Sequence, residues 1–269
     1  MVTDQQRIDM AMEYVEAAKE IVQRTRDAEA TQYLEFILSS GVICRIHRSE
    51  DGRVGKVGLS KVAPNLFSQN NQTALGIIPA YDEDGAADQP CHEFYMDFLQ
   101  FDRAYAMYRK AHHEIFLRSL PESPFMKGNF LLHEAGHAYL ATLNGTAGVE
   151  GDYESEEKDL EEGQLHSMNA RLQRLWGGPD YQVILEKAFY RMDKQSRRRN
   201  ATGTTGPAFH CDESWSDVFD RVFGPAPDQQ SRARRLERFV LVANLEWIER
   251  KGWQPLAQIR AQAIRAAGV

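Results

Sequence analysis

Long apolar runs and cysteine pairs are both missing from this sequence, and each absence excludes a class of protein. None of its apolar runs approaches the roughly 18–20 residues that a membrane-spanning helix needs, so we expect no membrane partner. Residues 1–10 lack the basic start and apolar segment of a secretory signal peptide. The three cysteines, Cys44, Cys91 and Cys211, are odd in number and widely spaced, which argues against a disulfide framework. We therefore predict a cytoplasmic protein.

Charge is unevenly distributed along the 269 residues, although the formal net charge is -7. The stretch from Arg191 to the end contains 14 Lys and Arg against 9 Asp and Glu, with basic residues densest at 191–199 and 232–238. Such basic segments are compatible with binding single-stranded DNA. We favour the simpler interpretation that they are the solvated faces of two helices, because the whole chain is acidic.

Hydrophobic periodicity predicts an α+β fold that is mostly helical. Residues 4–30 have the spacing of a long amphipathic helix, and three short β-prone runs after it, 36–46, 53–59 and 74–81, predict a small N-terminal sheet. The rest is predicted to be helical, at 93–118, 127–143, 155–176, 180–199, 212–223, 228–250 and 254–267. Turn-forming residues near 200–208 suggest a domain at 1–200 followed by a C-terminal helical extension at 201–269, although a single domain is also possible.

The segment His133-Glu134-Ala135-Gly136-His137 has the HExxH pattern of zinc hydrolases. Positions i and i+4 share one face of a helix, so two imidazoles can bind the same Zn²⁺ ion. Glu134 is offset by about 100° from His133, which suits a general base better than a ligand. Residues 130–139 carry no charge other than Glu134, as expected for a buried active-site helix. In the alternative interpretation, the two histidines are hydrogen-bonded core residues. That interpretation gives the glutamate between them, Glu134, no role.

The third zinc ligand has to come from another part of the chain. Leu140 and Leu143 occupy the glycine and histidine positions of the longer metzincin motif, so a glutamate on a later helix, as in gluzincins, is the better candidate. Glu161 and Glu162 both lie near the edge of the predicted buried stripe of that helix, Leu165, Met168 and Leu172. We favour Glu162, because His166 lies one turn later on its face and can support it.

Cys91 is a further candidate ligand, because thiolates bind zinc strongly and a flexible acidic loop at 82–90 precedes it. We predict that Cys91 closes the site as a fourth ligand until an activating event removes it. The simpler interpretation is a small, partly buried residue. His210, next to Cys211, is a weaker candidate for a second ligand or a transition-state donor.

The combination HEAGHAYL, followed about 25 residues later by Glu-x-x-Leu-His-x-Met-Asn, resembles the ImmA/IrrE-like bacterial metallopeptidases. The likeness covers roughly residues 74–175, and Leu165-His166 departs from the Ala-Asn/Asp pair usual in that family. The size, the C-terminal extension and Cys91 look more like the CBASS-associated CapP type. That type is paired with a helix-turn-helix repressor and is thought to be held inactive by a cysteine on zinc.

The resemblance implies a zincin-like fold and a regulatory endopeptidase that cleaves a helix-turn-helix repressor in an antiviral defence or DNA-damage response. We expect nucleic acid to stimulate this activity. Two other functions fit part of the pattern. A peptide deformylase-like enzyme also combines an upstream cysteine with HExxH, and a DNA-binding sensor would use zinc only structurally. Glu134 separates these classes, since a structural site needs no general base.

Overall fold

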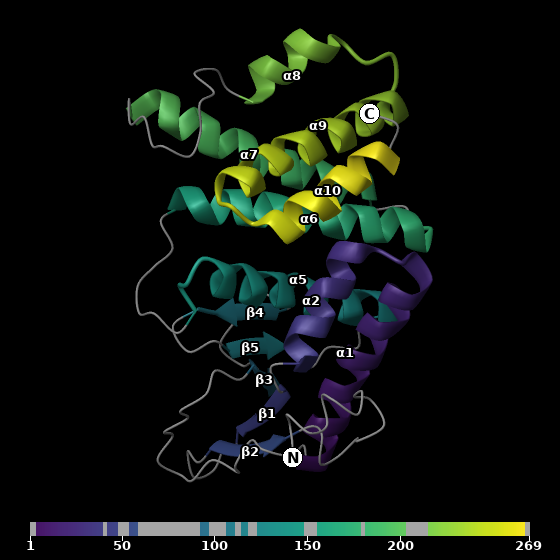
Figure 1. Cartoon of the computed structure of the whole chain (residues 1–269). Coiled ribbons are helices and arrows are strands. Elements are labelled where there is room, and N and C mark those ends of the chain that lie inside the picture. Colours follow the sequence, from purple (N-terminus) through teal and green to yellow (C-terminus); the bar gives the residue numbers. More distant parts are fainter. Residues whose placement is uncertain are drawn as a thin grey trace. The chain divides into compact units, whose positions relative to one another are not determined.

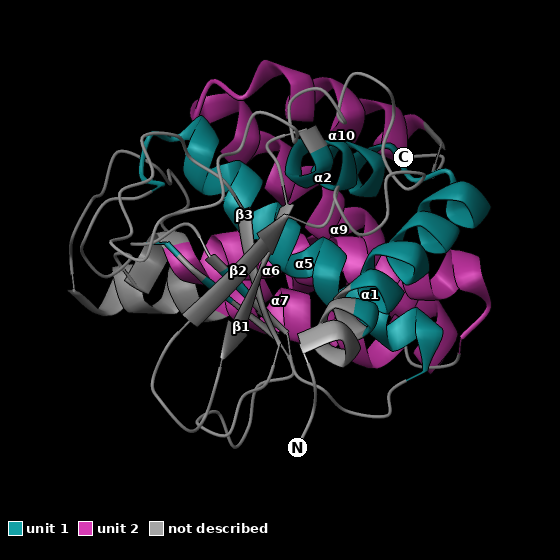
Figure 2. Cartoon of the chain, turned by 90° about the horizontal axis from the view of Figure 1, so that it is seen from below, with its two compact units in different colours: residues 1–151 teal, residues 152–269 magenta. Residues whose placement is uncertain are grey.

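The fold was analysed in a computed structural model, which divides the chain into two compact units at 1–151 and 152–269 (Figure 2). The structure describes residues 4–39, 42–47, 54–58, 92–96, 106–110, 114–117, 123–147, 155–178, 181–202 and 215–266. The units meet in sequence at 151/152, whereas we predicted a boundary near 200/201. Each unit is considered by itself below.

Unit 1 contains helices and a mixed sheet (Figure 1). Its described elements are α1 (Asp4–Thr25), α2 (Ala28–Ser39), β1 (Val42–His47), β2 (Val54–Gly58), β3 (His92–Met96), β4 (Ala106–Arg109), β5 (Glu114–Leu117) and α5 (Pro124–Leu143). The sheet order is β2-β1-β3-β5-β4, with parallel pairs β1–β3 and β3–β5 and antiparallel pairs at both edges. Helix α5 contacts α1 and α2 as well as the edge strand β4 and its neighbour β5. It is therefore the central helix of this unit.

The break between α1 and α2 corrects the predicted helix 4–30. Arg26 has a φ of 52°, a left-handed conformation that ends α1, and its N–H donates to the Val22 carbonyl. The Oδ1 atom of Asp27 then accepts a hydrogen bond from the Ala30 N–H at 3.0 Å, which caps the start of α2. Asp27, as a helix-capping residue, was the sequence signal for this break. The continuous apolar periodicity of residues 4–30 led us to overlook it.

The predicted fold class, a zincin-like α+β protein with a small N-terminal sheet, is wrong. Helices dominate the described chain, and the predicted segments do not build such a sheet. Strand β1 overlaps 36–46 and β2 lies within 53–59, but residues 36–39 end α2 and 74–81 lies outside the described residues. The other three strands lie between residues 92 and 117, almost entirely within 93–118, where we predicted a helix. Short aromatic-rich runs such as HEFYM and EIFL pack well in strands, and their spacing was misinterpreted as helical.

Unit 2 is helical throughout its described residues (Figure 1). Its elements are α6 (Ser155–Trp176), α7 (Tyr181–Thr202), α8 (Trp215–Phe223), α9 (Gln229–Arg250) and α10 (Gln254–Ala266). Helix α6 contacts α7 and α9, and α10 contacts α9. The predicted buried stripe of α6 is confirmed, because Leu165, Met168 and Leu172 are all fully buried.

Polar side chains are also buried along α6, which is unusual for a helix of such low apolar content. Asp159 is 3% exposed and forms an ion pair with Arg191 of α7 at 3.2 Å. Arg260 of α10 is fully buried and donates to the Gln164 carbonyl at 3.3 Å. Buried charges persist only when they are paired or hydrogen-bonded, so these contacts fix how α7 and α10 lie against α6.

None of the helices in the described ranges combines the length and the apolar character needed to cross a bilayer.

Candidate metal centre

Helix α5 carries the HExxH segment and begins at a well-formed cap. The Ser123 hydroxyl accepts a hydrogen bond from the Met126 N–H at 3.2 Å, and Pro124 occupies the first helical position. Every residue of the helix from Leu131 to Ala141 is buried. The motif therefore lies in the interior, as the lack of charge around it predicted.

A single glycine sets how closely α5 packs against α1. A Cβ atom added to Gly128 would lie 2.6 Å from both the backbone carbon and the carbonyl oxygen of Ala17. Contacts that short do not occur, so only glycine allows the two helices to approach this far. Gly128 precedes the first motif histidine by five residues, and this packing holds the start of α5 in place.

Tyr139 fixes α5 to α2 from a face that the motif histidines do not occupy. The Gln32 amide donates to the Tyr139 hydroxyl oxygen, and the Tyr139 ring contacts Tyr33 and Phe36 with centroid distances of 5.4 and 5.2 Å. Burial raises the pKa of Tyr139 above its usual value, with the Gln32 bond acting in the opposite direction. The tyrosine stays protonated at neutral pH and acts as a neutral anchor.

The two motif histidines lie together on one face of α5. Their ring centroids are 5.0 Å apart with an interplanar angle of 72°, and each side chain is only 8% exposed. Imidazoles in this edge-on arrangement can direct one nitrogen each toward the same ion. The helical spacing that the sequence implied therefore places two imidazoles on one face of α5, where they could bind the same ion.

Glu162 and His166 form a second pair, one turn apart on α6. The His166 Nε2 atom lies 3.3 Å from the Glu162 Oε2 atom, and both side chains are mostly buried. This contact restricts rotation of the carboxylate, which is the supporting role predicted for His166.

Three of the predicted ligands come together in the structure. One ligand atom from each of His133, His137 and Glu162 lies within 4.8 Å of the other two. A tetrahedral zinc ion with bonds of about 2.0–2.2 Å would separate its ligand atoms by roughly 3.4 Å. Among the described residues the group supplies two imidazoles and one carboxylate, the number of protein ligands that catalytic zinc sites use. This group could hold a metal ion, and its donor chemistry suits zinc.

Some of the other predicted site residues lie within the described ranges and others do not. Glu134 is buried at 7% exposure on the motif helix, and its role as general base stays a prediction. Glu161 is buried as well but does not belong to the three-residue group. Cys91, His210 and Cys211 lie outside the described residues, so the cysteine switch also stays a prediction.

Several arginines of the basic segment 232–238 are engaged within unit 2. Arg232 pairs with Glu186 at 2.9 Å and lies over the Phe219 ring. Arg235 donates to the carbonyls of Phe223, Gly224 and Pro225 at 2.9–3.3 Å. These contacts give both side chains a structural role. The predicted nucleic-acid surface, which also includes 191–199, is a hypothesis that no contact here tests.

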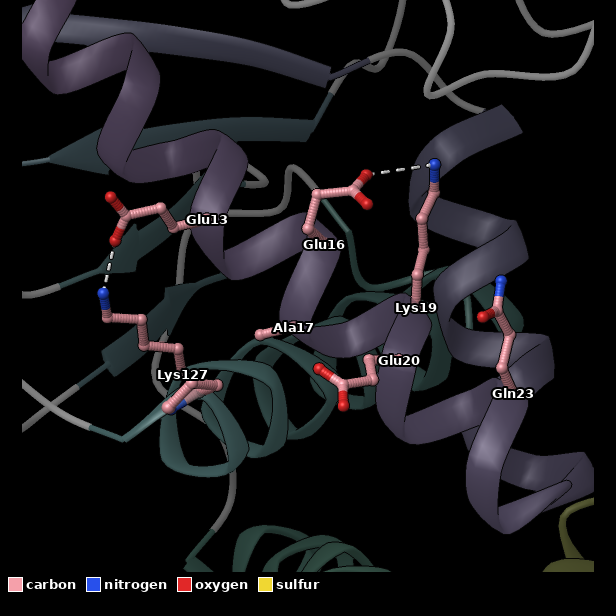
Figure 3. Close-up of a pocket in the computed structure, with 8 residues that line it drawn as sticks. Glu13, Glu16, Ala17, Lys19, Glu20, Gln23 and Lys127 are labelled. Atoms are coloured by element: carbon pink, nitrogen blue, oxygen red, sulfur yellow. Dashed lines mark hydrogen bonds and ion pairs between the residues drawn. The ribbon is translucent and has the colours of Figure 1, made fainter.

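A separate open pocket of about 530 Å³ lies beside α1 and the start of α5 (Figure 3). Two of its glutamates are paired with lysines, Glu13 with Lys127 and Glu16 with Lys19. A third, Glu20, also lines it. None of its lining residues belongs to the three-residue metal group, so the pocket is not part of that site.

Comparisons with known proteins do not identify a family for this chain. No protein-family model matches the chain, no curated protein matches its sequence, and no solved structure matches its fold. The resemblance to ImmA/IrrE-like peptidases therefore rests on the two sequence motifs alone.

Asn129 is a residue of this region that the motif-based reasoning missed. It precedes His133 by four residues and is 5% exposed. Its spacing of four residues before His133 was the available signal. Asparagine occurs in helices for many structural reasons, so this spacing alone does not identify a site residue.

Proposed function

We propose that this protein is a zinc-dependent peptidase. The proximity of His133, His137 and Glu162 is the observation that carries the proposal, because these are the residue types and the number of ligands that a catalytic zinc site uses. Within the part of the chain that the structure describes, the group has three protein ligands, the number of a catalytic site, whereas a structural site normally has four. The HExxH sequence supplies Glu134 beside the ligands, which a purely structural site would not require.

Each residue then has a defined task. His133, His137 and Glu162 would hold the ion through two imidazole nitrogens and a carboxylate oxygen, and His166 would orient Glu162. When bound, zinc supplies a Lewis acid that polarises the scissile carbonyl and lowers the pKa of water from about 15.7 towards ~7. Glu134 accepts a proton from the attacking water and delivers it to the leaving amine as the C–N bond breaks. The burial of α5 excludes bulk water, which strengthens these electrostatic interactions.

The proposed substrate is a protein, and the resemblance points to a helix-turn-helix repressor in a defence or damage-response operon. Repressor cleavage would release transcription of that operon. Control of such an enzyme by Cys91 belongs to the same proposal and has the same support, the resemblance together with the acidic, glycine-containing sequence of residues 82–90.

The deciding experiment is Glu134→Gln. We expect this variant to keep its fold and its zinc while losing hydrolysis of a protein substrate by about 10²–10⁴-fold. Suitable substrates are casein and any helix-turn-helix protein encoded beside the gene. Glu161→Gln is the matched control, because it alters another buried carboxylate that lies outside the ligand group. Full activity of Glu134→Gln, or a wild-type protein that binds no zinc, would exclude the proposal.

A further inference from the structure

Asn129 lies on the same face of α5 as the two motif histidines. Residues 129, 133 and 137 follow one another at intervals of four, and each step rotates the side chain by only about 40° around the helix axis. All three side chains thus fall within an arc of roughly 80°. The stripe of metal-binding residues continues one turn beyond the motif, toward the start of the helix.

The burial of Asn129 is energetically unfavourable. The side chain is 5% exposed, and among the residues that the structure describes its Oδ1 atom has no hydrogen-bond partner. Asparagine is also a poor residue for a helix interior, where leucine or alanine would be favoured. A buried acceptor without a donor destabilises the protein and therefore calls for an explanation. A donor supplied only in another state of the site would provide one.

His133 is the residue placed to supply that donor. Helical side chains lean toward the N-terminus, so the His133 ring extends over the turn that carries Asn129. The Cβ atoms of residues four apart are about 5–6 Å from each other, a separation that an amide and an imidazole can span with one hydrogen bond. Histidines that bind metals almost always donate their other ring N–H to an acceptor, which fixes the tautomer and the ring orientation.

We propose that Asn129 is a positioning residue for the metal site, with its Oδ1 atom accepting a hydrogen bond from the non-ligating ring N–H of His133. The bond forms when the metal holds the other nitrogen of the ring. This inference rests on the zinc site of the proposed function, and it adds the acceptor that orients the first ligand. The structure thereby explains why a polar residue lies unsatisfied in the interior of α5.

A purely structural role and a positioning role predict opposite patterns for Asn129→Leu. Because Oδ1 has no donor among the described residues, its replacement by an apolar side chain of similar size should leave the metal-free protein as stable or more stable. The same change removes the acceptor for His133, so zinc affinity should fall by about 10–100-fold. A side chain that merely supported the fold would instead lower stability and leave zinc affinity unchanged.

The experiment measures two quantities in each purified full-length variant: the thermal midpoint of the metal-free protein and the zinc dissociation constant, by competition with a chelating dye. The matched control is Asn244→Leu. Asn244 of α9 is another fully buried asparagine whose amide atoms have no partner among the described residues. Its replacement should change zinc affinity by less than about twofold, because it is not part of the ligand group. Asn129→Asp, which keeps an acceptor in place, should bind zinc at least as tightly as the wild type.

The possible outcomes test the role of Asn129 separately from the proposed zinc site. Weakened zinc binding in Asn129→Leu, with an unchanged or raised midpoint and normal binding in the control, supports the assignment. Equal zinc affinity in Asn129→Leu and wild type overturns it while leaving the zinc site intact. If Asn129→Leu fails to fold, Asn129→Asp decides, and weaker binding than wild type in that variant overturns the assignment. A wild type that binds no zinc removes the proposed function itself.

Discussion

The His166 Nε2 atom lies 3.3 Å from the Glu162 Oε2 atom, one helical turn apart on α6. The contact selects between two adjacent acids, because Glu161 points about 100° away from Glu162 around the helix. The supporting histidine thus identifies which carboxylate is prepared for a ligand role. The proximity of Glu162 to His133 and His137 agrees with the same choice.

Glu162→Gln should lose zinc to a much greater extent than Glu161→Gln. The amide of glutamine carries no charge and is a weak zinc ligand, so removing the ligating carboxylate lowers affinity sharply. Metal analysis after dialysis should find near-stoichiometric zinc in wild type and Glu161→Gln, and little in Glu162→Gln. The reverse order would move the ligand assignment to Glu161.

Local sequence signals predicted the metal site better than they predicted the fold. The spacing of His133 and His137, and the buried stripe of α6, are properties of a single helix, and helical periodicity expresses them directly. For the third ligand the sequence favoured Glu162 but left Glu161 as an alternative, because a rotation of about 100° between neighbours depends on tertiary packing that the sequence does not display. Asn129 was missed for the same reason, since its lack of a partner becomes visible only in three dimensions.

The strands show where local signals fail. Segments 92–96 and 114–117 are short, and their apolar residues fit both a helical and an alternating pattern. Their strand conformation depends on pairing with partners distant in sequence, such as Phe94 opposite both Cys44 and Ile115. Periodicity within one segment contains no information about such partners.

Gly128→Ala should destabilise unit 1 by about 3 kcal/mol, because the new Cβ would collide with backbone atoms of Ala17 that cannot move aside. Gly177→Ala is the matched control. It places a methyl group in open space and introduces only the strain of a positive φ of 94°, worth about 1 kcal/mol. Chemical denaturation measures both changes. Equal costs for the two variants would show that the close approach of α1 and α5 is not needed.

Arg235→Ala should lower the free energy of unfolding by about 1–2 kcal/mol, since it removes charge-assisted hydrogen bonds to the carbonyl of the last residue of α8 and to the two carbonyls after it. Arg234→Ala, at the neighbouring exposed position, should change stability by less than about 0.5 kcal/mol. Thermal unfolding of both proteins tests the difference. If the two substitutions have the same effect, the capping role assigned to Arg235 is incorrect.

Cys91→Ser should leave zinc bound while raising basal cleavage of the protein substrate, because a thiolate on the ion would otherwise occupy the position of the attacking water. Cys91 lies outside the described residues, so this prediction depends on its sequence position and on the resemblance. Zinc content and cleavage rate are measured on the same preparation. Loss of zinc together with activity would make Cys91 an obligatory ligand, and an unchanged rate would show that it has no part in the site.

Zinc should stabilise the folded protein in a manner that depends on the ligand group. A ligand that binds only the native state adds RT ln(1 + [L]/Kd), which amounts to about 2.7 kcal/mol at one hundred times Kd. For a chain of this size that corresponds to a rise in Tm of roughly 5 °C, and EDTA should reverse it. His133→Ala should show almost no response to zinc, because it removes one of three clustered ligands, whereas Glu161→Gln should respond like the wild type. A zinc-dependent shift that persists in His133→Ala would place the ion elsewhere in the protein.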